Sequence, residues 1–281
     1  MSARILLCSD LDRTILPNGS QPESAEARPR LRVLAARPEC TLAYVSGRHE
    51  ALLREAIEAY DLPLPDYAIG DVGTTIYQVQ SADRWIPSPA WAEEIAPDWA
   101  GLGHADLAEL LDGLDHLEQQ EPEKQNRFKL SYYAPQDIPR DALLDTVRRR
   151  LDPHRVRASL IWSVDEAAHV GLLDVLPASA TKLHAIRFLM RELGFDEASA
   201  VFAGDSGNDL PVLTSGLQSV LVHNAREEVR EEALRLAPVP DRLYVARGGF
   251  LGMNGNYAAG VLEGVSHFIP EARAWLEPVT G

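Results

Sequence analysis

The chain has 281 residues, of which 46% are hydrophobic and 25% are charged, an ordinary globular composition that allows one large or two smaller domains. Lys and Arg number 27 against 42 Asp and Glu, so the formal net charge is −15. This acidity argues against nucleic acid and anionic membrane surfaces as partners. The amino-terminal apolar run is too short for a signal peptide, and no window reaches the length of a membrane span, so we expect a cytoplasmic protein.

The first part of the chain alternates between predicted strands and helices. The stretch "ILLCSDLDRT", residues 5–14, begins with an apolar run that is typical of a strand buried on both faces, and residues 41–45 predict a second such strand. Residues 49–60 predict a helix, because their apolar side chains recur with a period of 3.6 residues. Residues 67–79 predict a strand, a glycine turn and another strand. Both cysteines lie in or beside these strands, so we expect buried, inert thiols and no disulfide framework.

Residues 81–176 show a different order of predicted helices and strands from the first part of the chain. "HADLAELLDGLDHL", residues 104–117, predicts a helix, and a second helix is expected near 140–151. Strands are predicted over three further segments: 127–133, 155–163 and 169–177. This pattern indicates a small α+β unit inserted into the first domain. The predicted domains are therefore a core of residues 1–80 and 177–281 and an insertion of residues 81–176.

The alternating pattern then resumes. "SATKLHAIRFLMREL", residues 179–193, predicts an amphipathic helix that stops at Gly194. Strands are predicted over 199–204 and 218–222, and the closing helix over 257–268. The predicted fold class is α/β, with a Rossmann-like parallel sheet in the core.

Three of the predicted core strands end in polar clusters. These clusters are "SDLD" at residues 9–12, "SGR" at 46–48 and "GDSGND" at 204–209. In open α/β sheets, ligands bind in the crevice outside the carboxyl ends of the strands. We therefore expect the three clusters to meet at one crevice.

The residue types in these clusters indicate phosphoryl chemistry. Asp10, Asp205 and Asp209 would repel one another without a cation, and hard carboxylate oxygens favour Mg²⁺. An aspartate can act as a nucleophile and form an aspartyl phosphate, while a second carboxylate protonates the leaving alcohol and later deprotonates water. Ser46 and the amide of Gly47 are able to bind phosphoryl oxygens, and Lys182 would add a fixed positive charge.

Structural alternatives exist for each of these residues. Asp10 and Asp12 can belong to a solvated turn, because Asp is common where strands end. Asn208 and Asp209 suit a helix cap, and Lys182 suits the surface of its helix. Arg48 is able either to bind phosphate or to brace its own loop, and the sequence leaves this open.

The four motifs "DLDRT", "VSGR", Lys182 and "GDSGND" resemble, in order and spacing, those of the haloacid dehalogenase-like (HAD) phosphohydrolases. The position of the insertion is similar to that of a Cof-type α/β cap. Within the superfamily, "SDLDRT", "PDYAIGDVGTTIY", "KLSYY" and "FAGDSGNDLPVL" together resemble the sucrose-phosphate phosphatase family.

The resemblance implies a role for each matching residue. It implies that Asp10 is the nucleophile, Asp12 the general acid and base, and Lys182 a catalytic cation. Ser46 and Gly47 would bind the phosphoryl group. Arg48, to which the resemblance assigns no role, is a further candidate for substrate binding. The implied metal ligands are the Asp10 side chain, the Asp12 carbonyl and Asp205, with Asn208 and Asp209 in support.

The insertion is where a sugar would be recognised. Lys129, Ser131 and Tyr133 alternate along one predicted strand and therefore share a face, which could contact a disaccharide together with Trp85 or Trp162. The alternative is that these aromatic side chains form the core of the insertion.

We therefore expect a Mg²⁺-dependent phosphatase that acts through a phosphoaspartate, on sucrose 6-phosphate or a related disaccharide phosphate. The alternatives are a phosphatase for another glycosyl phosphate (mannosylfructose phosphate or glucosylglycerate phosphate), a phosphomutase, and a non-catalytic sugar-phosphate binding module. The expected partner is a small sugar phosphate and the expected state is a monomer, with association with a glycosyltransferase as a further option.

Overall fold

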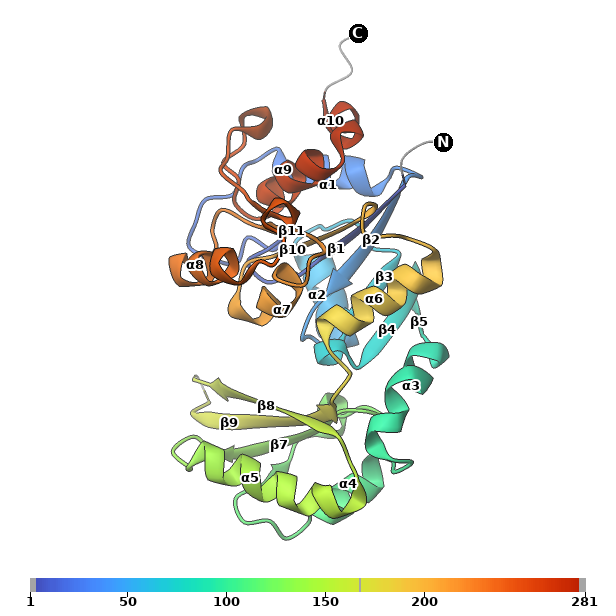
Figure 1. Ribbon diagram of the computed structural model, residues 1–281, viewed down its shortest axis with the longest axis vertical. Coiled ribbons are helices and arrows are strands. Elements are labelled where there is room, and N and C mark those ends of the chain that lie inside the picture. The colour runs from blue at the N-terminus through green and yellow to red at the C-terminus, as the bar shows by residue number, and fades with distance from the viewer. Residues whose placement is uncertain (1–3, 167, 278–281) are drawn as a thin grey trace. The chain divides into compact units, whose positions relative to one another are not determined.

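The structure, a computed structural model, describes residues 4–166 and 168–277 and divides into two compact units (Figure 1). The first unit contains the residues up to Pro87 and those from Lys182 onward, and the second contains Ser88–Thr181. The predicted boundaries lie a few residues earlier: the first falls inside the strand Thr75–Ser81, and the second falls at the end of the strand Val170–Pro177. Residues 1–3 and 278–281 of the predicted core lie outside the described residues.

The sheet of the first unit has eight strands in the order β12-β11-β10-β1-β2-β3-β4-β5. Their bounds are β1 Ile5–Ser9, β2 Cys40–Val45, β3 Tyr67–Gly70, β4 Thr75–Ser81, β5 Arg84–Pro87, β10 Ala200–Gly204, β11 Gln218–Leu221 and β12 Leu243–Val245. The six strands from β12 to β3 are parallel, and β4 and β5 form an antiparallel extension. The chain order reverses between β1 and β10, where Leu6 is opposite Ala200. The predicted α/β fold with a parallel core sheet is confirmed.

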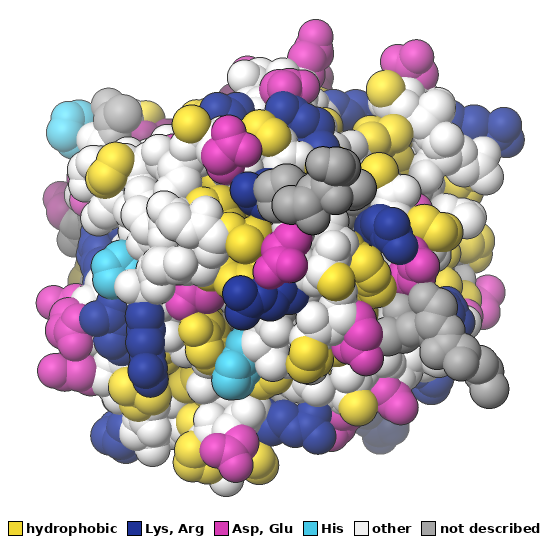
Figure 2. Space-filling model, turned by 90° about the horizontal axis from the view of Figure 1, so that it is seen from above, with side chains coloured by type: hydrophobic (Ala, Val, Ile, Leu, Met, Phe, Trp, Pro, Cys, Tyr) yellow, Lys and Arg dark blue, Asp and Glu magenta, His cyan; other side chains and the backbone are white. Residues whose placement is uncertain are grey.

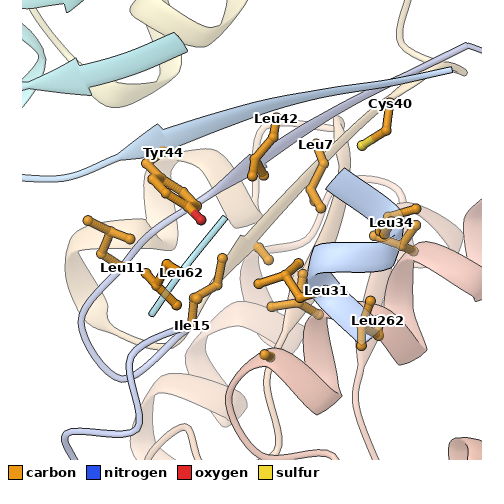
Figure 3. Packing of buried hydrophobic residues seen from close by; sticks show 14 of the residues in the cluster. Leu7, Leu11, Ile15, Leu31, Leu34, Cys40, Leu42, Tyr44, Leu62 and Leu262 are labelled. Atoms are coloured by element: carbon orange, nitrogen blue, oxygen red, sulfur yellow. The ribbon is translucent and has the colours of Figure 1, made fainter. Parts of the chain in front are cut away.

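Seven helices of the described chain belong to the first unit. They are α1 Ala27–Ala35, α2 Glu50–Ala59, α6 Lys182–Leu193, α7 Leu210–Leu213, α8 Glu227–Leu236, α9 Ala258–Phe268 and α10 Pro270–Leu276. Figure 3 shows Leu31 of α1 and Leu262 of α9 near Leu7 and Leu42, which extend from β1 and β2 into the same apolar cluster. Burial of this cluster fixes the strands whose ends carry the polar residues.

The two cysteines lie in the sheet of the first unit, Cys8 in β1 and Cys40 at the start of β2. Cys8 and Cys40 are both free and buried. Burial raises the pKa of each thiol to about 12, with the charge of Asp66 contributing at Cys40. The prediction of buried thiols is therefore confirmed, and the raised pKa values agree with low reactivity.

The second unit is built on a four-stranded antiparallel sheet in the order β6-β7-β9-β8. Its elements are α3 Pro89–Ile95, α4 His104–Leu111, β6 Glu118–Gln119, β7 Leu130–Pro135, α5 Arg140–Leu151, β8 Ala158–Asp165 and β9 Val170–Pro177. Helices α4 and α5 cover one face of this sheet (Figure 1). The α+β character predicted for the insertion agrees with these elements.

One predicted helix is too long. The pattern of residues 104–117 predicted a single helix, but α4 ends at Leu111. Asp112 leaves the helical conformation, and Gly113 has a φ of 69°, which glycine adopts without the steric cost of a side chain. The leucines beyond this point continue the apolar spacing in a turn.

Charge is dispersed over the face of the molecule that Figure 2 presents. Lys and Arg side chains there are interspersed with Asp and Glu, and no field of a single sign dominates. Within the described ranges, none of the helices has the length and apolar character needed to cross a membrane.

Candidate active site

Three buried carboxylates meet at the carboxyl ends of β1 and β10. Asp10 follows β1, Asp205 follows β10, and Asp209 closes the short 3₁₀ turn Gly207–Asp209. Each offers an oxygen within 4.8 Å of the others. The meeting results from the parallel pairing of β1 with β10, in which the Asp10 amide donates to the carbonyl of Ala203 at 2.9 Å. The three carboxylates thus gather where the strand order of the sheet reverses.

Lys182 lies among these carboxylates. It is the first residue of α6, and its Nζ is 2.7 Å from Asp10 Oδ1 and 2.8 Å from Asp209 Oδ1. Burial alone would lower the pKa of Lys182, but the charges of Asp10 and Asp209 raise it above its ordinary value. Lys182 therefore stays cationic and fixes the orientation of both carboxylates.

The negative charge of the cluster is only partly compensated. Burial, together with the nearby Asp209 and Asp205, raises the pKa of Asp10 to about 7 despite Lys182. Burial and Asp209 likewise raise the pKa of Asp205 to about 6, against the opposing charge of Arg13. Both carboxyls gain protons far more readily than a solvated aspartate, as expected for crowded anions in a poorly hydrated site.

Asp209 is fully engaged by the protein itself. Its Oδ1 accepts from Lys182, and its Oδ2 accepts from the Asp205 amide and from the amide and hydroxyl of Ser206, each at 3.1 Å. Asn208, in contrast, is exposed. Of the predicted metal ligands, the structure brings together the side chains of Asp10, Asp205 and Asp209, and Asp209 acts mainly as the anchor of the loop.

The remaining carboxylate oxygens fit a hard divalent cation. Asp10 Oδ2 and Asp205 Oδ1 lie 3.3 and 3.4 Å from the Thr14 hydroxyl, which has one hydrogen to share between them. Two weakly satisfied oxygens in a buried acidic cluster are the donor type and charge that Mg²⁺ prefers. A bound cation would lower the raised pKa values of both carboxyls.

Asp12 lies in a different environment from Asp10. Its Oδ2 accepts from Arg48 Nε at 2.9 Å, and its Oδ1 accepts from Arg48 Nη2 at 2.6 Å and from Asn18 Nδ2 at 2.7 Å. Burial acts to raise the pKa of Asp12, but the hydrogen bonds and charge of Arg48, with Asn18, lower it overall. Arg48, for which the sequence left two roles open, is here paired with the carboxylate of Asp12.

The polar residues after β2 also lie in the first unit. Ser46 is buried, and its hydroxyl accepts from the Arg48 amide at 3.2 Å. Gly47 is exposed, and a Cβ added there would meet only Val72, at 3.9 Å. The loop therefore orients the Ser46 hydroxyl through its own backbone and leaves the Gly47 amide free of side-chain crowding.

The strand residues predicted to contact a sugar, Lys129, Ser131 and Tyr133, lie in the second unit, whereas Trp85 is buried in the core of the first. Lys129 is buried, with its Nζ 3.9 Å from Asp174 Oδ1, and Ser131 donates to the same carboxylate. The Tyr133 hydroxyl accepts from Lys124 Nζ at 2.6 Å and donates to Glu121 at 2.8 Å. Ser131 and Tyr133 are opposite Asp174 and Leu172 of β9, on one face of the sheet.

Three further residues contact the predicted site residues and were missed from the sequence. They are Arg13, whose Nε is 3.3 Å from Asp205 Oδ2, Thr14, between two carboxylates, and Asn18, which bonds Asp12. Thr14 could have been predicted as a site residue, because its hydroxyl follows Asp10 by only four residues in the same loop. The conformations that bring Arg13 and Asn18 to these carboxylates have no counterpart in the local pattern.

Comparison with known proteins gives consistent matches along almost the whole chain. The family model described as Sucrose-6F-phosphate phosphohydrolase matches residues 3–269. A HAD-like hydrolase of Nitrosococcus oceani is 60% identical over 279 residues, covering 99% of this chain and 75% of that protein. Sucrose-phosphatase 1 of Nicotiana tabacum is 26% identical over 278 residues, and the match covers 95% of this chain but spans only 60% of the tobacco protein's length.

A solved structure gives the same result. The sucrose-phosphatase from Synechocystis sp., in complex with sucrose and phosphate, superposes with a TM-score of 0.69 and 27% sequence identity. The match covers 95% of this chain and 98% of the Synechocystis chain. Both units are therefore included in the similarity.

Proposed function

Because the chain belongs to the sucrose-6F-phosphate phosphohydrolase family of HAD-like phosphoric monoester hydrolases, we propose that it removes the phosphoryl group from a phosphorylated disaccharide, with sucrose 6-phosphate as the leading candidate. The observation that carries this proposal is the Asp10 carboxylate, held by Lys182 at 2.7 Å inside a buried acidic cluster. A nucleophile fixed in orientation next to a cation-binding site is what phosphoryl transfer needs.

The residues present fit Mg²⁺, which we propose Asp10 and Asp205 would hold together with the backbone carbonyl of Asp12. When bound, the ion would supply positive charge to the carboxylates and to the phosphoryl oxygens. Lys182 would add a second positive charge from the protein, and the Ser46 hydroxyl and Gly47 amide would hydrogen-bond the phosphoryl group.

In the proposed first step, a carboxylate oxygen of Asp10 attacks phosphorus and the ester bond to the sugar oxygen breaks. Asp12 gives its proton to the departing sugar oxygen, so a neutral alcohol leaves. In the second step, Asp12 removes a proton from water, which attacks the phosphoaspartate. Inorganic phosphate is released, the Asp10 carboxylate is regenerated and Asp12 regains its proton.

The pairing of Asp12 with Arg48 explains how this acid could be controlled. While Arg48 and Asn18 bond both oxygens of Asp12, its pKa is lowered and the carboxyl is a poor proton donor. We propose that Arg48 transfers to the phosphoryl oxygens of the substrate. Loss of the guanidinium would raise the pKa of Asp12 as the substrate binds, which unites the substrate-binding role predicted for Arg48 with its pairing to the acid.

The second unit would recognise the glycosyl part of the substrate. Two polar groups lie on β7 and β9 or beside them: Asp174 with Lys129 and Ser131, and Tyr133 with Lys124 and Glu121. Donors and acceptors held in this way suit sugar hydroxyls, because a polar site left unpaired by the wrong sugar loses affinity.

The proposal is tested by measuring inorganic phosphate release from a panel of phosphorylated sugars. The panel includes sucrose 6-phosphate, mannosylfructose phosphate, glucosylglycerate phosphate and glucose 6-phosphate, each with Mg²⁺ and with excess EDTA. We expect release that depends on Mg²⁺ and is fastest with a disaccharide phosphate. A preference for glucose 6-phosphate would contradict the disaccharide assignment, transfer of the phosphoryl group without release would indicate a mutase, and binding without turnover would indicate a non-catalytic module.

A further inference from the structure

Arg13 holds an unusual backbone conformation beside the acidic cluster. It has a φ of 60°, in the left-handed region that a residue with a long side chain rarely adopts. Its amide donates to Asn18 Oδ1 at 2.8 Å, and its carbonyl accepts from Asn224 Nδ2 at 2.6 Å. Asn224 is itself fixed, because its Oδ1 accepts from the Tyr257 amide at 2.8 Å. Bonds on both sides thus maintain a conformation that the residue would not choose alone.

This conformation directs the guanidinium of Arg13 to a proposed metal ligand. The Nε of Arg13 lies 3.3 Å from Asp205 Oδ2, and the two side chains are 32% and 6% exposed. The Nε is buried and has no hydrogen-bond partner within the described part of the chain. The contact with Asp205 is therefore a partly desolvated ion pair. Charges attract more strongly there than at an open surface, because less water screens them.

The positive charges around the cluster are divided between two residues. Lys182 is bonded to Asp10 and Asp209, whereas Arg13 is the cation paired with Asp205. Each of the three carboxylates consequently has a cation supplied by the protein. A divalent ion that approaches Asp205 must share this carboxylate with the guanidinium and is repelled by its charge.

We propose that Arg13 is a built-in counter-ion of Asp205 that competes with the divalent cation. It stabilises the metal-free site and weakens metal affinity, so that the ion exchanges instead of remaining permanently bound. This inference rests on the proposed function for the identity of the ion. It goes further because it assigns the tuning of metal affinity to a residue that is not a ligand.

The test is Mg²⁺ binding to the full chain, measured by isothermal titration calorimetry. Arg13→Asn removes the charge, and Asn tolerates a positive φ and can keep both backbone hydrogen bonds. Arg13→Lys keeps the positive charge but has a shorter side chain. Arg235→Gln is the matched control, since it makes the same change in net charge at an exposed arginine paired with Glu232.

We expect Arg13→Asn to bind Mg²⁺ about three- to tenfold more tightly than the wild type, because removing a partly screened neighbouring charge has an effect of this order. Its metal-free form should unfold at a lower temperature, Arg13→Lys should be intermediate, and Arg235→Gln should match the wild type. Circular dichroism verifies that each variant is folded.

Other outcomes overturn the inference in distinguishable ways. Unchanged affinity in Arg13→Asn would mean that the guanidinium does not compete, and weaker affinity would mean that it orients Asp205 for the metal. An unchanged Mg²⁺ affinity with weaker binding of inorganic phosphate would assign Arg13 to the substrate. Absence of Mg²⁺ binding in the wild type would overturn this inference together with the metal dependence of the proposed function.

Discussion

Asp10 and Asp12 are separated by one residue of the same loop, yet they lie in opposite electrostatic environments. Asp10 is buried among two other carboxylates, and its pKa is raised to about 7. Asp12 is half-exposed and bonded by Arg48 and Asn18, which lower its pKa. The end of β1 thus places one aspartate in the buried carboxylate cluster and the other beside the guanidinium of Arg48.

The difference shows how one short motif can supply two chemical roles. The Asp10 carboxylate, which lies in the buried cluster and is oriented by Lys182, suits a nucleophile that works beside a metal. The Asp12 carboxylate, whose pKa is lowered by Arg48 and Asn18, suits a proton donor that acts only after the substrate has drawn Arg48 away, as we propose. The predictions below test this division, beginning with the largest effect.

Removing the proposed nucleophile should have the largest effect. Asp10→Asn is expected to reduce phosphate release by about 10⁴-fold or more, because loss of a nucleophile removes the covalent route. The fold should persist, since the change removes one of three crowded charges. A stopped assay of phosphate release measures the loss, with Asp115→Asn, at an exposed position, as the control. Substantial turnover by Asp10→Asn would refute the mechanism.

Removing the proposed acid should have a smaller effect that depends on the substrate. Asp12→Asn is expected to lower kcat for a sugar phosphate by roughly 10²- to 10⁴-fold, the range for general acid–base catalysis. The loss should be smaller with p-nitrophenyl phosphate, whose leaving group departs without a proton. Initial rates with both substrates measure the contrast. Equal losses would indicate that Asp12 acts on the phosphoryl group or the metal instead.

Replacing Arg48, which pairs with Asp12, should shift the pH dependence of catalysis. Arg48→Gln is expected to raise the pKa of Asp12 in the free enzyme, so the limb of the pH profile of kcat/KM that belongs to Asp12 should shift to higher pH. The maximal rate should fall about tenfold from the loss of orientation. The control is Arg54→Gln, which removes an arginine paired with Glu50. A tenfold loss with an unshifted profile would assign Arg48 to substrate binding alone.

The smallest expected effect is the pH dependence of stabilisation by Mg²⁺, which tests the carboxylate cluster that contains Asp10 and Asp205. The folded-state pKa values of Asp10 and Asp205, about 7 and about 6, exceed the ordinary value of 3.8. Without metal, their protonation therefore favours the folded state at low pH, and this contribution is lost as pH rises through 6 to 7. A divalent ion requires the deprotonated carboxylates, so Mg²⁺ should stabilise the protein more at high pH.

Thermal unfolding with EDTA or excess Mg²⁺ measures this contribution. We expect Mg²⁺ to raise Tm by about 5 °C at pH 8 and by about 1 °C or less at pH 5. Sodium chloride of equal ionic strength is the control for screening. An equal rise at both pH values would contradict the coupling between proton and metal binding.

The strand ends were predictable from the sequence because parallel strands obey a simple geometric rule. Asp10 and Asp205 follow apolar runs that had to be buried, and the carboxyl ends of such strands face one crevice. Only the pairing of β1 with β10 was beyond reach, since it depends on packing between segments far apart in the chain. The meeting of these carboxylates with Lys182 therefore agrees with the expectation, while the proposed roles remain predictions.

The details that the sequence could not provide depend on tertiary contacts. The role of Arg48 was open, because an arginine after a strand is equally suited to bind phosphate or to brace its own loop, and its pairing with Asp12 was not predicted. The left-handed conformation of Arg13 depends on Asn224, more than 200 residues away in the chain. The end of α4 at Leu111 was also missed, since the leucine spacing outlasts the helix and the conformation of Gly113 decides its end.

The pairing of β1 with β10 also constrains how the molecule is made on the ribosome. Leu6 is opposite Ala200, so the central strands cannot join until the chain has been synthesised past Gly204. Ser88–Thr181 is one continuous compact segment that is synthesised between the two halves of this sheet. Throughout its synthesis Asp10 lacks Lys182, so the amino-terminal strands must wait for the later part of the chain before the acidic cluster can form.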